Sequence, residues 1–202
     1  MNKNKFARII PVALTLLIAA VVIAALVSLA RFIFFPETST KPVKSDTEIS
    51  REALLSTSAD RAVSLVARGP IVADESFRSY QIKVTTTSRN LTVFSGYLDQ
   101  PIKVVSLANN NSAYEQFVYA LDKANMVKGV ELSGDYNDLR GICASGNVYE
   151  YKTLKADAIQ KSLWTSTCSG SRGSLNASTV QLNNLFMAQI PNSRAIISEV
   201  WQ

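Results

Sequence analysis

The sequence predicts an α+β domain with a mainly antiparallel sheet and about three helices, preceded by one N-terminal transmembrane helix. Three observations predict this architecture. Residues 9–30 carry no charge, residues 80–108 alternate between apolar and polar side chains, and residues 112–126 and 178–190 repeat apolar side chains at helical spacing. A period of two is typical of strands with one wet face, and a period of 3.6 is typical of amphipathic helices.

The uncharged run is long enough to cross a bilayer. Its 22 residues span about 33 Å as a helix, against a hydrocarbon core of about 30 Å. Three basic residues, Lys3, Lys5 and Arg8, precede it, and only Arg31 follows closely. The positive-inside rule then places residues 1–8 in the cytoplasm and the rest of the chain outside it. A cleaved signal peptide ending at Ser28-Leu29-Ala30 is the alternative, although its apolar core is usually shorter.

A polar, proline-containing linker, residues 36–45, joins this signal-anchor helix to an extracytoplasmic domain, residues 46–202. Four of the 21 basic residues and none of the 16 acidic ones lie in the first 35 residues. The remaining 17 basic and 16 acidic residues leave the rest of the chain almost neutral. The domain therefore has no excess of basic residues of the kind that binds nucleic acid, and we expect no nucleic-acid partner.

The sequence of the first half of the domain predicts one helix followed by three strands. Asp46 or Thr47 caps a helix with an apolar stripe that continues to Val66, and Gly69-Pro70 stops the helix. The alternative is a break into two helices at Ser56-Thr57-Ser58. The alternating residues then predict a hairpin of strands 80–86 and 91–97 about a turn at 88–90. A third strand is expected over residues 102–108.

The second half alternates helices and strands. We expect a helix after residues 109–112, a strand pair at 142–144 and 148–154, and a strand at 163–168. A last helix begins at Asn176 or Ser178, Pro191-Asn192 ends it, and a terminal strand follows at 195–201. Apart from the short segment 142–144, the order is α, three strands, α, two strands, α and one strand.

The two cysteines, Cys143 and Cys168, are the strongest candidate pair. If strands 148–154 and 163–168 form a hairpin, both cysteines lie at the same end of it, within bridging distance. Two cysteines outside the cytoplasm usually form a disulfide, and closing this loop stabilises the fold by about 3 kcal/mol. Two buried thiols are the alternative; the spacing is not that of a CxxC redox site.

No catalytic, cofactor-binding or metal-binding residues are predicted. The chain has no histidine, which excludes histidine-based nucleophile activation and the HExxH zinc site. Asp135, Asn137 and Asp138 form an oxygen-rich loop with Glu131 nearby, but it lacks the calcium-loop pattern and reads as a solvated turn. We expect no cofactor, and Arg140-Gly141 reads as an ordinary turn rather than a phosphate loop.

These features favour a binding role over catalysis. We expect a single-pass membrane protein whose extracytoplasmic domain is an interaction or scaffold component of the cell envelope, with a protein partner or a second copy of itself. A solute- or wall-binding module is the first alternative and requires a concave pocket lined by aromatic side chains. A membrane-anchored Ser/Lys hydrolase is the second and requires a buried lysine beside a serine.

Overall fold

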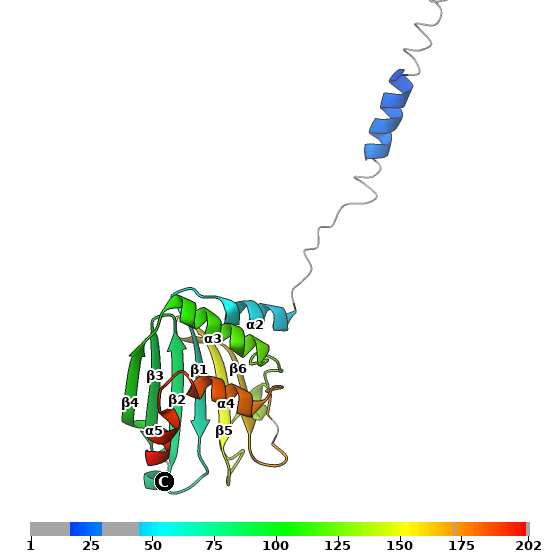
Figure 1. The fold of residues 1–202 in the computed structure, drawn as a ribbon. Coiled ribbons are helices and arrows are strands. Elements are labelled where there is room, and N and C mark those ends of the chain that lie inside the picture. The colour runs from blue at the N-terminus through cyan, green and yellow to red at the C-terminus, as the bar shows by residue number, and fades with distance from the viewer. Residues whose placement is uncertain (1–16, 30–44, 172, 201–202) are drawn as a thin grey trace, which may run out of the picture. The chain divides into compact units, whose positions relative to one another are not determined.

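A computed structural model describes residues 17–29, 45–171 and 173–200 of the chain (Figure 1). The chain divides into two units, Met1–Val43 and Lys44–Gln202. In the first unit, residues 17–29 form a helix with exposed side chains. Across the described residues, no helix combines the length and the apolar character needed to cross a bilayer. Residues 9–16 and 30 of the expected span, the tail 1–8 and most of the linker lie outside the described residues, so the anchor stays a prediction.

The second unit is built on one antiparallel sheet of six strands in the order β4-β3-β2-β1-β5-β6. The strands are β1 Arg61–Arg68, β2 Arg78–Thr85, β3 Ser88–Ser95, β4 Gln100–Ala108, β5 Val148–Lys155 and β6 Ala158–Ser166. The expected α+β class with a mainly antiparallel sheet is therefore confirmed, whereas the described residues of this unit form four α-helices rather than about three. Strand β1 lies in the middle and joins the β2-β3-β4 meander to the β5-β6 hairpin.

The expected helix over residues 46–66 is wrong in its second half. Helix α2 covers only Asp46–Leu55, where Ser45 and Glu48 form a capping box, and residues 61–68 form β1. Six consecutive residues of β1 are buried because its two faces are both covered. A strand buried on both faces reads as a continuous apolar run, which periodicity cannot distinguish from a helix.

The hairpins are confirmed, with shifts in their turns. Thr85 Oγ1 accepts the backbone N–H groups of Thr87 and Ser88 at 3.1 and 2.8 Å, which places the β2-β3 turn at 86–87 rather than 88–90. Strands β5 and β6 join through Ala156 and Asp157, both with positive φ, as a tight type I′ hairpin requires. Residues 142–144, expected as a strand, lie in the loop before β5.

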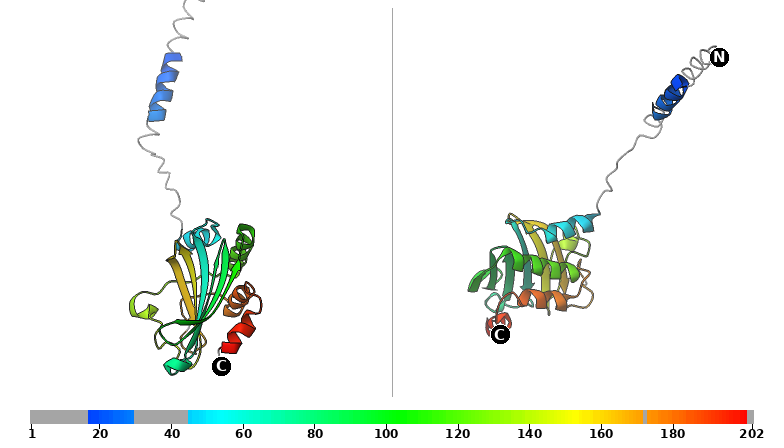
Figure 2. Two further views of the ribbon diagram at one scale, coloured as in Figure 1. Left: turned by 90° about the vertical axis from the view of Figure 1, so that its left-hand side faces the viewer. Right: turned by 45° about the horizontal axis from the view of Figure 1, so that its top comes forward.

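The α-helices that follow β4 and β6 cover one face of the sheet (Figures 1 and 2). Helices α3, Asn111–Lys123, and α4, Thr179–Met187, begin at the caps Asn110 and Ser178 and confirm the predicted helices. The expected terminal strand is wrong, because Ser193–Val200 is helix α5. Its apolar side chains at 196, 197 and 200 recur at helical spacing and pack against the core, and this burial overrides strand propensity.

The main core lies between the sheet and these helices. Fully buried side chains of the central strands meet Leu121 and Phe186, and Phe117 packs edge-on against Phe186 at 5.2 Å between ring centroids. The short 3-10 helix η2, Gly134–Asn137, lies on the opposite side of the sheet (Figure 2). A second small cluster there packs Leu132, Leu139 and Ile142 on Trp164. The segment between α3 and β5 therefore covers part of the sheet's other face.

Candidate functional site

A cleft of about 610 Å³ lies on the face of the sheet opposite α3. It forms where β1 ends, between the β3-β4 turn on one side and the loop that precedes β5 on the other. This volume falls in the range of about 300–1,000 Å³ typical of small-molecule sites. The cleft collects residues from five separate stretches of the sequence.

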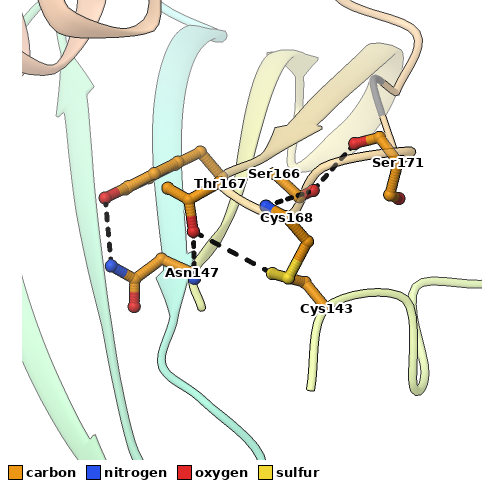
Figure 3. The surroundings of a disulfide bond; sticks show 7 residues. Cys143, Asn147, Ser166, Thr167, Cys168 and Ser171 are labelled. Atoms are coloured by element: carbon orange, nitrogen blue, oxygen red, sulfur yellow. Dashed lines mark hydrogen bonds between the residues drawn. A yellow bond between two sulfur atoms is a disulfide. The ribbon is translucent and has the colours of Figure 1, made fainter. Parts of the chain in front are cut away.

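A disulfide holds one side of this cleft in place. Cys143 and Cys168 are joined, with an S–S distance of 2.07 Å and a Cα–Cα distance of 5.4 Å (Figure 3), as predicted. Beside the bridge, Thr167 Oγ1 accepts the backbone N–H of Asn147 at 2.9 Å. On the other side, Ser166 Oγ accepts the Cys168 N–H at 3.2 Å and donates to the Ser171 carbonyl at 2.7 Å. The disulfide and the Asn147–Thr167 bond tie the loop before β5 to the end of β6, and the two Ser166 bonds hold the turn that follows β6.

A pair of stacked aromatic rings forms the opposite wall. Phe77 is buried, and Tyr97 stacks on it with ring centroids 4.1 Å apart. The Tyr97 hydroxyl donates to the Val72 carbonyl at 2.7 Å and accepts the Val72 N–H at 3.1 Å. Asp74 also accepts the backbone N–H of Tyr97 at 2.7 Å. The Tyr97 ring is therefore fixed in orientation although it is 46% exposed.

Charged side chains line the floor of the cleft. The Arg68 guanidinium lies 3.4 Å from an Asp99 carboxylate oxygen and 3.7 Å from a Glu150 oxygen. Glu150 is buried and also pairs with Lys152, and Ser79 Oγ donates to Asp99 at 3.2 Å. The β1-β5 register sets Val66 opposite Glu150, so alternate residues of both strands share this face.

The rim carries one tight ion pair. The Arg140 side chain donates to both carboxylate oxygens of Asp138. This hydrogen bonding lowers the pKa of Asp138 to about 2. Asp138 belongs to the oxygen-rich loop that the sequence singled out, but here a guanidinium occupies its oxygens. Among the described residues, no group of three potential ligands is placed to hold a metal ion.

Elsewhere, the structure brings a buried lysine and a serine together. Lys161 Nζ, on β6, donates to Ser50 Oγ, on α2, at 3.2 Å. The Ser50 hydroxyl in turn donates to the Asp46 carbonyl one helical turn earlier, at 2.6 Å. A catalytic lysine must accept the serine proton. Because that proton is directed to a helix carbonyl, the geometry is that of a contact between α2 and the sheet.

The two edges of the sheet differ. At the β6 edge, Glu131 accepts the Ser162 N–H at 2.6 Å, and Ser174 accepts the Trp164 N–H and donates its own N–H to the Trp164 carbonyl, both at 3.0 Å. At the other edge, β4 pairs only with β3 in the part of the chain that the structure describes. The exposed side chains of β4 include Ile102 and Val104, the latter 62% exposed.

No protein family matches the chain, and no curated protein is significantly similar to it in sequence. The function is therefore inferred from the geometry of the site. Of the residues that line this cleft, the sequence predicts only Cys143 in a structural role; it interprets Asp138 and Arg140 as parts of turns and misses Arg68, Phe77, Asp99 and Glu150. No local pattern marks these four residues, because only the pairing of distant strands brings them together.

Proposed function

We propose that this chain is a single-pass membrane protein whose extracytoplasmic domain binds a protein partner in an assembly of the cell envelope. The proposed role is binding rather than catalysis. The observation that carries it is the contrast between the covered β6 edge and the open, apolar β4 edge. The membrane location rests on the uncharged run over residues 9–30 and the basic residues before it.

Open edge strands are usually blocked, because their unpaired N–H and C=O groups invite pairing with another chain. The β6 edge follows this rule with the carboxylate of Glu131 and the residue 173–175 segment. On β4, Pro101 and Lys103 protect the beginning of the strand. From Val104 to Ala108 the strand has no charged residue, and this half can accept an extended segment of a partner as a seventh strand.

The Ser/Lys hydrolase is a weaker hypothesis than the binding role. A serine on a helix whose hydroxyl donates to the preceding turn is a common structural arrangement. Lys161 is then a donor that satisfies the Ser50 oxygen and joins α2 to β6. A binding module is also consistent with the near-neutral charge of the domain, which suits contacts based on strand pairing and apolar burial.

Crosslinking of the full-length protein in its native membrane tests the proposal. We compare the natural chain with Val104→Lys, which places a charge on the open edge, and with Val180→Lys as a matched control. Val180 is also an exposed valine, 72% exposed, but it lies on α4. Mass spectrometry should recover one near-stoichiometric protein partner from the natural chain and from Val180→Lys, and much less of it from Val104→Lys.

Three results would count against the proposal. Recovery of monomer alone removes the interaction role. Equal recovery from all three proteins removes the β4 edge as the contact surface. Full release of the chain from membranes by alkaline carbonate removes the anchor. A crosslinked species of twice the monomer mass that is lost in Val104→Lys supports the edge and identifies a second copy as the partner.

A further inference from the structure

The cleft on the sheet's other face has features that strand pairing at β4 does not use. One wall carries the Phe77–Tyr97 stack, and the opposite wall carries Leu139, Val148 and the disulfide. Charged groups lie between these walls, on the floor. A partner strand added to β4 would extend the sheet at its edge and would leave this cleft untouched. The cleft therefore needs its own explanation.

The Tyr97 ring is held in one orientation and offers a flat surface to a ligand. Phe77 occupies one face of its ring, and the hydroxyl is held by both polar groups of the Val72 backbone. The Tyr97 side chain is 46% exposed and lines the cleft, so part of the fixed ring is accessible to a ligand. The face of an aromatic ring is electron-rich, so it attracts the weakly positive C–H groups of a flat, partly apolar molecule.

The floor and rim offer donors and acceptors without net charge. Arg68 and Arg140 line the cleft with Asp99, Asp138 and Glu150, and the charge of Glu150 is also balanced by Lys152, which is not one of the lining residues. Arg68 donates one long hydrogen bond to Asp99, at 3.4 Å, and its contact to Glu150 is 3.7 Å, so its other N–H groups can donate to a ligand. An ion of either sign would be attracted by one set of charges and repelled by the other. The floor instead suits a neutral molecule that both donates and accepts hydrogen bonds.

We propose that this cleft binds a neutral saccharide unit. A sugar ring has an apolar C–H face for the open side of Tyr97 and hydroxyl groups on its edge for Arg68, Asp99 and Glu150. The planar guanidinium and carboxylate groups can each form paired hydrogen bonds with neighbouring hydroxyls. This site is independent of the β4 contact, because the two surfaces share no residue.

Saturation-transfer difference NMR on the full-length protein in detergent tests this proposal. The probes are tetramers of N-acetylglucosamine and of glucose at millimolar concentration. Sorbitol serves as a polyol without a ring. We expect the strongest transfer to C–H protons on one face of the sugar ring for at least one tetramer, and no transfer to sorbitol.

Three variants and one control variant locate the binding. Tyr97→Phe keeps the ring and should retain most of the signal, whereas Tyr97→Ala removes the platform and should abolish it. Tyr119→Ala is the matched control, because Tyr119 is also half exposed, at 51%, but lies on α3. Asp99→Asn removes one floor carboxylate, and asparagine tolerates the positive φ of 52° there. It should weaken binding severalfold even if Tyr97→Ala fails to fold.

Absence of saturation transfer from the natural chain to either tetramer overturns the proposal. So does a signal that survives Tyr97→Ala with the fold intact, or a signal that Asp99→Asn leaves unchanged. None of these results bears on the crosslinking of the β4 edge, so failure of one proposal is distinguishable from failure of the other.

Discussion

Removal of the Cys143–Cys168 disulfide should cost much of the stability of the domain. The bridge closes a loop with a sequence separation of 25. In the chain-entropy description, a crosslink over a loop of this length lowers the entropy of the unfolded chain enough to stabilise the fold by about 3.5 kcal/mol. For a domain of this size, each kcal/mol corresponds to about 2–4 °C, so the melting temperature should fall by about 7–14 °C.

The variant Cys143→Ala/Cys168→Ala tests this value in urea unfolding followed by tryptophan fluorescence. Dithiothreitol should lower the stability of the natural protein to that of the variant and should leave the variant unchanged. A loss below about 1 kcal/mol would refute the reasoning. An equal effect of dithiothreitol on both proteins would show that the reductant acts elsewhere. Because the bridge fixes the cleft wall that contains Leu139, its loss should also weaken saccharide binding.

Four further substitutions test individual features of the fold. Leu65→Ala should cost about 2–5 kcal/mol in urea unfolding, because Leu65 is fully buried in central β1; a neutral effect would argue against this strand assignment. Gly170→Ala and Gly173→Ala both force an alanine to adopt a positive φ, which should lower the free energy of unfolding by about 1–2 kcal/mol. At Gly173 the new Cβ would also lie 2.2 Å from a carbonyl oxygen of β6. The second variant should therefore lose about 1–3 kcal/mol more, and equal losses would contradict this contact. Arg140→Gln should raise the pKa of Asp138 from about 2 towards its ordinary value, as carboxyl NMR titration can measure.

The sign of the Asp138 effect follows from its lowered pKa. Folding favours the ionised carboxylate, because Arg140 donates hydrogen bonds to it only in the folded chain. The stabilisation is present above the ordinary pKa of the group and is lost as the pH falls towards about 2. In Arg140→Gln this acid-dependent part of the unfolding curve should disappear. An unchanged curve would mean that the exposed pair contributes nothing to stability.

Local patterns in the sequence were enough for most elements of the sheet and for two helices. Strands β2, β3 and β4 show a period of two because one of their faces is wetter than the other. Helix α3 shows the 3.6 period because only one of its faces packs on the core, with Tyr114, Phe117, Val118 and Leu121 buried. The disulfide could be predicted because the short β5-β6 hairpin brings the two cysteines to one end of the sheet.

Long-range contacts determine the elements and the site residues that these local patterns do not predict. Strand β1 and helix α5 were assigned wrongly, because their short apolar runs fit either structure until the surrounding layers are known. The cleft depends on the register that brings Arg68 to Glu150 and on the turn that places Tyr97 over Phe77. The sequence by itself determined the fold class, the cysteine pair and the near neutrality of the domain, since these follow from composition and short-range periodicity. Only the tertiary structure decided which edge of the sheet is open and which distant side chains share a site, because both depend on strand pairing far apart in the chain.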